Sequence, residues 1–143
     1  MRNEHMFING EWVETRTGQS APVINPSTGE EFARISLGDA NDVDAAVKAA
    51  RNAFPAFSAQ SRQARIELLQ RIVEGFAERG EELAEAISTE MGAPITFARS
   101  AQVGSGPNHL NEMIRVLGEY EFEERWDSTR IMKEPIGVCG LIT

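Results

Sequence analysis

The mostly apolar run at the end of the sequence, Ile136 to Thr143, restricts the possible folds of this chain more than any other feature. It has the length of a strand, follows Pro135 and contains no charged residue. A nearly continuous apolar run is typical of a strand buried on both faces, as in a parallel sheet. Parallel strands need neighbours that are reached through crossover connections. No other run here has this character, so we expect a truncated α/β protein in which this strand lacks the rest of its sheet.

Composition and charge exclude several other classes of protein. The 143 residues are 41% hydrophobic and 25% charged, which is ordinary for one globular domain. The formal net charge of −8 argues against a nucleic-acid partner and against docking on anionic lipid. A single cysteine excludes an internal disulfide and a cysteine-rich zinc site. Because no apolar segment has the length of a signal peptide or a membrane span, we expect a cytoplasmic protein without a membrane partner.

Residues 1–38 are expected to form short strands and turns. Asn9-Gly10 lies between two apolar pairs and favours a hairpin with a type I′ turn, because both turn positions need a positive φ. A second compact turn is predicted at Asn25-Pro-Ser-Thr-Gly29. The alternation of apolar and polar residues from Glu31 to Leu37 indicates a half-buried strand.

Residues 39–118 have the apolar spacing of four helical segments. Asp39 and Ser61 are suitable N-caps for the first two helices. We expect Pro55 to limit the first helix, and Gly80 to close the second in a left-handed cap.

The other two helical segments contain further glycine and proline residues. The third helix is expected to end at Gly92. The fourth runs from about Ile95 to Leu117. A kink or break is predicted within it at Gly104-Ser-Gly-Pro107, since glycine and proline weaken a helix interior.

The segment 119–134 is predicted to be an acidic linker followed by an exposed strand. Glu119 to Glu124 is acidic and of the kind that is ordinarily solvated. Ser128 to Lys133 has the composition of an edge strand. The free edge of such a strand is able to pair with another subunit.

Several short motifs, taken in order, resemble the N-terminal portion of an NAD(P)-dependent aldehyde dehydrogenase. They are Phe7-Ile-Asn-Gly-Glu-Trp12, Asn25-Pro-Ser-Thr-Gly29, Asp42-Val-Asp-Ala-Ala-Val47, Ala84-Glu-Ala-Ile-Ser-Thr-Glu-Met-Gly92 and Glu134-Pro-Ile-Gly-Val-Cys-Gly140. The resemblance covers essentially the whole chain. It implies an incomplete fold of that family with N-terminal strands (1–38), a helical part of the cofactor-domain scaffold (39–118), an acidic linker with an oligomerisation strand (119–134) and a first strand leading to the cofactor cleft (135–143).

The resemblance implies an enzyme that oxidises an aldehyde to a carboxylic acid with NAD or NADP, as a homo-oligomer. In the family, a Pro-Trp-Asn segment that helps to hold the oxyanion follows the strand ending at Thr143. The lysine and glycine-rich turn that bind the dinucleotide, the glutamate general base and the cysteine nucleophile come later still. We therefore expect no catalytic residue within the 143 residues, weak or no cofactor binding and no activity of the chain alone.

Three groups of positions match non-catalytic sites of the family. Ile142 and Thr143 correspond to residues that line the cofactor cleft, and Ala101 and Ser105 to residues of the aldehyde tunnel. Glu90, together with main-chain oxygens near Val23 and Ile24, corresponds to a site for a monovalent cation, for which carboxylate and carbonyl oxygens are suitable ligands. A solvated glutamate and a simple loop or kink remain the alternatives for Glu90 and for Ala101 with Ser105.

Other residues that carry chemistry are better explained by structure. Cys139 has no neighbouring base or cation in sequence, and we expect a small buried residue rather than a nucleophile. The glycines of Gly137-Val-Cys-Gly140 lack the spacing of a phosphate-binding loop. His5 and His109 have no third ligand at metal spacing. Trp12 and Trp126 are expected to be packing residues without a catalytic role.

Two other kinds of protein remain open from the residues alone. One is a self-contained acidic helical module that binds a partner through its apolar helix faces. The other is a decayed remnant of a dehydrogenase that is without catalysis or is reused for interaction. The aldehyde, the choice of NAD or NADP and the oligomeric state are not set by these residues.

Overall fold

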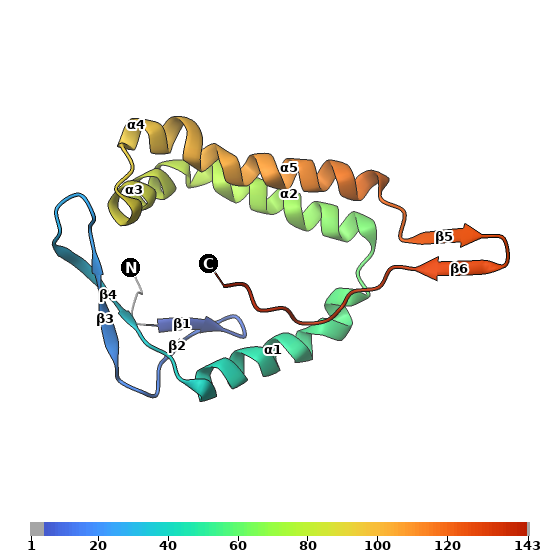
Figure 1. Ribbon diagram of the computed structural model, residues 1–143, viewed down its shortest axis with the longest axis horizontal. Coiled ribbons are helices and arrows are strands. Elements are labelled where there is room, and N and C mark those ends of the chain that lie inside the picture. The colour runs from blue at the N-terminus through green and yellow to red at the C-terminus, as the bar shows by residue number, and fades with distance from the viewer. Residues whose placement is uncertain (1–4, 143) are drawn as a thin grey trace.

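The computed structural model describes residues 5–142, which form three separate β-hairpins and a set of helices (Figure 1). The hairpins pair β1 (His5–Ile8) with β2 (Glu11–Glu14), β3 (Ser20–Ile24) with β4 (Glu31–Ser36), and β5 (Glu123–Trp126) with β6 (Thr129–Met132), all antiparallel. The helices are α1 (Ala40–Ser58), α2 (Arg62–Glu78), α3 (Gly80–Met91), α4 (Ile95–Phe97), the π-helix η1 (Ala98–Gln102) and α5 (Val103–Glu119).

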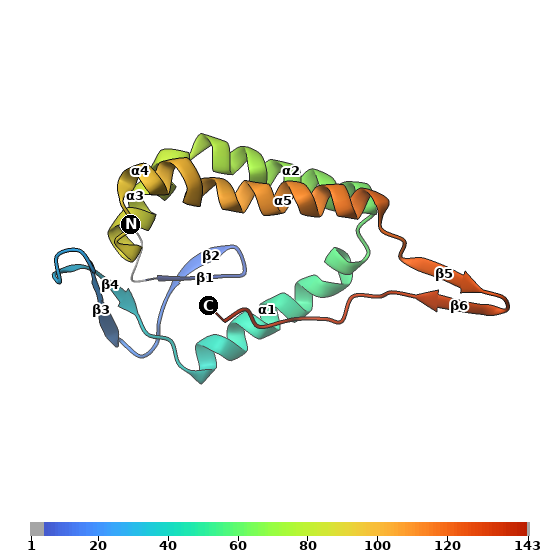
Figure 2. The same ribbon diagram turned by 45° about the horizontal axis from the view of Figure 1, so that its top comes forward.

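The helices α2 and α5 lie side by side and antiparallel, because the start of α2 contacts the end of α5 at Arg62 and Gly118, and Phe76 near the end of α2 lies against Gly106. The helix α1 diverges from this pair, and the β1–β2 hairpin lies between them (Figures 1 and 2). The β5–β6 hairpin projects away from the helices at one end of the molecule in both views, while β3–β4 lies at the other end beside α3.

Turns and helix caps that depend on nearby residues agree with the sequence. Asn9 and Gly10 have φ values of 56° and 83°, as the predicted hairpin turn requires. The Asp39 carboxylate accepts hydrogen bonds from the backbone N–H groups of Asn41 (2.8 Å) and Asp42 (3.1 Å), and the Asp42 carboxylate accepts one from Asp39 N (3.0 Å). This reciprocal capping box fixes the start of α1.

The N-cap Ser61 is also confirmed, since its hydroxyl accepts a hydrogen bond from Ala64 N at 3.2 Å. Gly92 ends α3 in the left-handed conformation with a φ of 73°, and its N–H donates to Ser88 O. Both caps satisfy backbone groups that the helix itself leaves without partners.

Two predicted helix boundaries are wrong. Pro55 does not limit α1, which continues to Ser58. In its last turn, Pro55 O accepts from Ala59 N, and Ser58 O accepts from the Arg65 guanidinium at 2.8 Å, so the end of the helix has partners for these carbonyls. Gly80 does not close α2 in a left-handed cap. It begins α3 directly after Arg79, since Leu83 N already donates to Arg79 O.

The predicted kink at Gly104-Ser-Gly-Pro107 is also wrong in its position. This segment is helical within α5, and the irregularity is the π-helix at 98–102 that precedes it. A π-turn accommodates one extra residue per turn, so it changes the register of the helix just before Pro107, which has no N–H to donate to Val103. Gly106 serves packing rather than bending, because a Cβ there would lie 2.8 Å from ring atoms of Phe76.

The predicted buried strand at 135–143 is not formed in the part of the chain that the structure describes. Residues 133–142 contain neither helix nor strand, and Ile136, Leu141 and Ile142 are 93%, 93% and 99% exposed. A strand needs a neighbouring strand for its backbone hydrogen bonds, and among residues 5–142 none pairs with this segment. The segment instead runs beside α1, where Gly137 approaches Arg51 (Figure 1).

Few side chains are fully enclosed. Among the described residues the buried apolar side chains are Ala84 and Ala98, where α3 meets η1. Large apolar side chains on α1 remain exposed, including Val43 and Val47. None of the helices between residues 5 and 142 is both long and apolar enough to cross a membrane.

Candidate functional site

The residues proposed for a cation site come from two elements that meet at one end of the molecule. Ile24 ends β3 at a register irregularity next to Val23, and Glu90 is exposed near the end of α3. The turn after β3 contacts the end of α3, since a Cβ on Gly92 would lie 3.0 Å from Pro26 Cγ. This contact brings Glu90 to the same end as the two strand residues.

Beside Glu90 lies an open groove of about 370 Å³, lined on the strand side by Phe32 and on the α3 side by Leu83, Ala86 and Thr89. Within residues 5–142, no group of three or more His, Cys, Asp or Glu side chains is placed to hold a metal ion. Glu90 is not the only charged side chain at this groove, since Glu82, Glu85 and Arg79 also line it.

The residues proposed for the aldehyde tunnel lie on the irregular helix. Ala101 belongs to η1 and Ser105 to the first turn of α5, and both are exposed. The Ser105 hydroxyl donates to Gln102 O at 2.7 Å, while the side-chain oxygen of Gln102 is buried and has no partner in the described chain. π-Turns occur often at functional sites, so the irregular helix is compatible with a binding role for these two positions.

An ion pair holds η1 against α3. The Arg99 guanidinium donates to both carboxylate oxygens of Glu81, with Nε 3.0 Å from each. This hydrogen bonding lowers the pKa of Glu81 and raises the pKa of Arg99. Because both side chains are about half exposed, the pair contributes more to the orientation of η1 than to stability.

The C-terminal segment does not form a site by itself. Ile142, the described member of the proposed cofactor contacts, is almost fully exposed, and Thr143 lies outside the described residues. Cys139 is exposed rather than buried as predicted, because the strand that would enclose it is not formed. Its thiol is free.

The described residues therefore do not fit a dinucleotide on their own, and no step of hydride transfer is assigned to them. Of the two histidines, His109 is exposed on α5, and His5 lies 3.9 Å from Glu14. Trp12 packs against the Phe7 ring as expected, whereas Trp126 is 66% exposed on the projecting hairpin and is not a packing residue.

Sequence reasoning missed a cluster of cations and aromatic rings at the base of the β5–β6 hairpin, which we call the hairpin base. It borders an open cavity of about 470 Å³. Arg65 at the start of α2 donates to the carbonyls of Phe57, Ser58 and Gln60, and its guanidinium lies 5.6 Å from the centroid of the Phe57 ring. These contacts cap the end of α1. The other members of the hairpin base are Arg62, Tyr120, Phe122 and Lys133.

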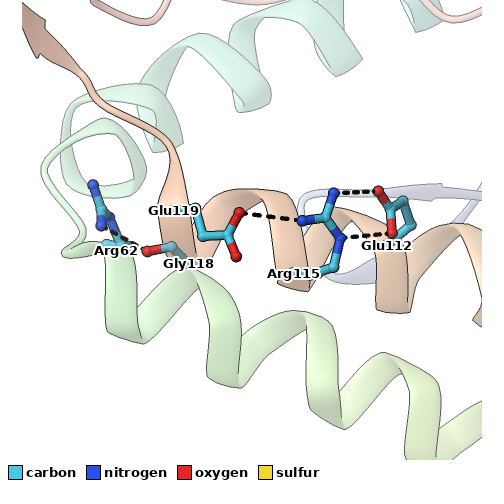
Figure 3. Close-up of polar contacts among 5 residues, drawn as sticks. All are labelled: Arg62, Glu112, Arg115, Gly118 and Glu119. Carbon is cyan, nitrogen blue, oxygen red and sulfur yellow. Dashed lines mark hydrogen bonds and ion pairs between the residues drawn. The ribbon is translucent and has the colours of Figure 1, made fainter.

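The sequence does contain a signal for this cluster. Arg62 and Arg65 lie in the first turn of a helix, where the helix dipole disfavours cations. Two arginines in such a place indicate partners outside their own helix. Arg62 contacts the end of α5 through Gly118 O, as Figure 3 shows.

The exposed face of the same end of α5 carries a local ion network (Figure 3). Arg115 lies between Glu112 and Glu119, with contacts of 2.7 Å and 3.2 Å, and this arrangement lowers the pKa of Glu112 and raises the pKa of Arg115. All three side chains are more than half exposed, so the network is a surface feature of the helix.

Comparison with known proteins shows the family of this chain. The sequence matches the aldehyde dehydrogenase family over residues 12–143. It is 43% identical, over 96% of this chain and 29% of the relative, to 3-succinoylsemialdehyde-pyridine dehydrogenase of a Pseudomonas species. The chain spans about 30% of the length of the curated relatives it matches.

Solved structures agree over most of the chain. Aldehyde dehydrogenase C of Pseudomonas syringae, crystallised with NAD+ and octanal, is 40% identical and superposes with a TM-score of 0.88 over 91% of this chain and 27% of its own. Aldehyde dehydrogenase of Bartonella henselae is 36% identical, with a TM-score of 0.85 over 89% of this chain and 27% of its own. The sequence match extends from residue 12 to residue 143, most of the backbone agrees with solved structures, and the chain belongs to the aldehyde dehydrogenase family.

Proposed function

We propose that this chain is the scaffold portion of an enzyme that oxidises an aldehyde to a carboxylic acid with NAD or NADP. The observation that carries the proposal is the agreement of 91% of the chain, at a TM-score of 0.88, with an aldehyde dehydrogenase crystallised with NAD+ and octanal. The chain itself supplies no catalytic group. Its part is to hold the helices and strands around a cofactor and substrate site formed with other residues.

Within that enzyme we assign non-catalytic contacts to three groups of residues. Ile142 and Thr143 would meet the cofactor, and Ala101 with Ser105 would line the path of the aldehyde. The exposure of Ile142 and of the helix positions supports this assignment, because each is available to a partner surface. Glu90 with the backbone of Val23 and Ile24 would hold a monovalent cation, which the contact between α3 and the β3–β4 turn supports.

We assign assembly into a homo-oligomer to the β5–β6 hairpin. Within residues 5–142 each of its strands pairs only with the other, and Trp126 and Met132 expose apolar side chains on it. A free edge with exposed apolar side chains pairs readily with an edge of another chain. The absence of a membrane-spanning helix in residues 5–142 and the acidic charge support a cytoplasmic enzyme.

The test compares two preparations. The product of the complete reading frame that contains codons 1–143 is assayed for reduced nicotinamide with a panel of aldehydes and with NAD or NADP, beside the 143-residue chain alone. We expect aldehyde-dependent reduction by the first and none by the second. A reading frame that stops after Thr143, or a product inactive with every aldehyde, would contradict the proposal and favour an interaction module.

A further inference from the structure

The direction of the β5–β6 hairpin is set at its base. The main contact of each strand is with the other strand, and the hairpin projects from the helices in both views (Figures 1 and 2). The chain enters it from Tyr120, where α5 ends in an extended conformation. An element held only at one end takes its orientation from the contacts at that end.

Arg62 makes the contacts that join the entering leg of the hairpin to α2. Its Nη1 donates to Gly118 O at 2.9 Å, and its Nη2 donates to Tyr120 O. Its guanidinium carbon lies 5.7 Å from the centroid of the Phe122 ring, within cation–π range. One side chain thus holds the last turn of α5, the residue where the helix ends and the first residues of the hairpin.

The leaving leg is fastened to the entering leg by Lys133. Lys133 N donates to Phe122 O at 2.9 Å. The Lys133 ammonium donates to Glu121 O at 3.1 Å and to the Glu124 carboxylate, and lies 4.8 Å from the Tyr120 ring centroid. These contacts join the two legs to each other, and the Arg62 side chain joins the entering leg to α2.

Small rotations at the base have large effects at the tip. From Phe122 to Trp126 the strand is about 14 Å long, so a rotation of about 20° moves its end by about 5 Å, which is about the spacing between paired strands. An edge displaced by that distance no longer meets the edge of a partner. The orientation of the hairpin must be fixed before a second copy can pair with it.

We propose that Arg62 is a positioning residue for assembly: it holds the β5–β6 hairpin at the angle at which its edge pairs with a second copy of this chain. The inference rests on the assembly role proposed above. Lysine at this position could reach one carbonyl but could not bridge two while lying on a ring, because its ammonium is a single point charge on a flexible stem.

The test measures the orientation and the assembly separately. Spin labels are placed on exposed positions of α2 and of the hairpin turn, at Glu74→Cys and Ser128→Cys, in a Cys139→Ser background. Two quantities are compared: the distribution of distances between the two spin labels, and the dissociation constant of the assembly from analytical ultracentrifugation. They are measured for the labelled chain without further change (the parent) and for Arg62→Ala, Arg62→Lys and Arg79→Ala. Arg79 is the matched control, since this exposed arginine forms its ion pair in the described chain with the nearby Glu82.

We expect a narrow distance distribution for the parent and for Arg79→Ala, and a clearly broader one for Arg62→Ala. The dissociation constant of Arg62→Ala should rise about tenfold, the size of effect typical for hydrogen bonds to a charged group. The distance distribution and the dissociation constant of Arg62→Lys should lie between those of the parent and of Arg62→Ala, and its helical circular dichroism should be unchanged. The lysine variant keeps one contact with a carbonyl at the end of α5, so it still tests the role of Arg62 if the alanine variant does not fold.

Two results would overturn the inference. One is an Arg62→Ala distribution as narrow as that of the parent, and the other is a broadened distribution with an unchanged dissociation constant. A parent chain that stays monomeric at every concentration contradicts the assembly role itself, and with it the purpose assigned to Arg62. That failure is recognised from the parent alone, before any variant is compared.

Discussion

Apolar side chains occur both on the antiparallel helices α2 and α5 and in the C-terminal segment 133–142. Only the two helices form regular secondary structure and pack against each other. Each helix satisfies its backbone hydrogen bonds internally. The two then need only a complementary surface, which Phe76 and Gly106 provide. The C-terminal segment has the composition of a strand, and a strand satisfies its backbone only through a neighbour.

This difference shows that apolar composition predicts burial only when the structural partner that the segment needs, such as a neighbouring strand, is present. In the described chain, Ile136 and Leu141 are more exposed than Val43 or Val47 of α1. An exposed apolar segment of this kind marks a surface that another element covers. The proposed function is compatible with such an element, because it forms the cofactor site together with other residues.

The largest expected effect tests the helix side of the comparison. Gly106→Ala places a Cβ 2.8 Å from the Phe76 ring and should lower the free energy of unfolding by about 1–3 kcal/mol, the usual cost of overpacking. Gly104→Ala is the matched control in the same helix, since its Cβ meets nothing within 4 Å. That variant should gain up to about 1 kcal/mol in helix propensity. Chemical denaturation of both variants checks this, and equal effects would show that the contact with Phe76 is unimportant.

A second substitution tests the junction between α3 and the β3–β4 turn. Gly92 has a φ of 73°, and a Cβ there would lie 3.0 Å from Pro26 Cγ. Gly92→Ala should cost about 1–2 kcal/mol for the left-handed backbone alone, with a further loss from the contact. Gly29→Ala, at a φ of 76° with open space around it, isolates the backbone cost. If thermal melting gives the same loss for both, the junction is looser than the structure indicates.

A pH dependence follows from the start of α1. Hydrogen bonds from the Asn41 side chain and from the Asp42 backbone lower the pKa of Asp39. Since the folded-state pKa is then below the unfolded one, this stabilisation is present above about pH 4 and is lost as pH falls through the folded-state pKa. Asp39→Asn keeps the acceptor oxygen without the titration, so its melting temperature should fall less on acidification. Parallel melting curves for the two proteins would contradict this.

The smallest expected effect tests the other side of the comparison. Leu141→Ala and Ile136→Ser should change the free energy of unfolding of the 143-residue chain by no more than about 0.5 kcal/mol, because both side chains are 93% exposed. Denaturation in urea measures this. A loss above about 1 kcal/mol for either would mean that the segment already packs against the helices. The comparison with α2 and α5 would then no longer hold.

Local signals in the sequence predicted local structure well. The hairpin turn at Asn9-Gly10, the caps at Asp39 and Ser61 and the helix end at Gly92 depend on a few adjacent residues, and all are confirmed. The family resemblance is likewise confirmed, because it rests on motifs spread along the chain.

Features that depend on distant residues were predicted poorly. The helix α1 continues past Pro55, and its last carbonyls are bound by Arg65 of another helix, a contact that local sequence does not reveal. Gly106 was predicted to break the helix, because the sequence does not show that the Phe76 ring packs beside it. The hairpin base joins residues about 60 positions apart in sequence, with Arg62 and Tyr120 separated by 58. The contacts assigned to the cation, cofactor and aldehyde stay predictions.

The most direct test of the account is the effect of Cys139→Ala on aldehyde-dependent reduction of NAD by the product of the complete reading frame. The account assigns the chain a scaffold role without a nucleophile, so the variant should keep essentially the activity of the parent. An active parent whose activity is abolished by Cys139→Ala, with the fold retained, would place the reacting thiol inside this chain and contradict the account.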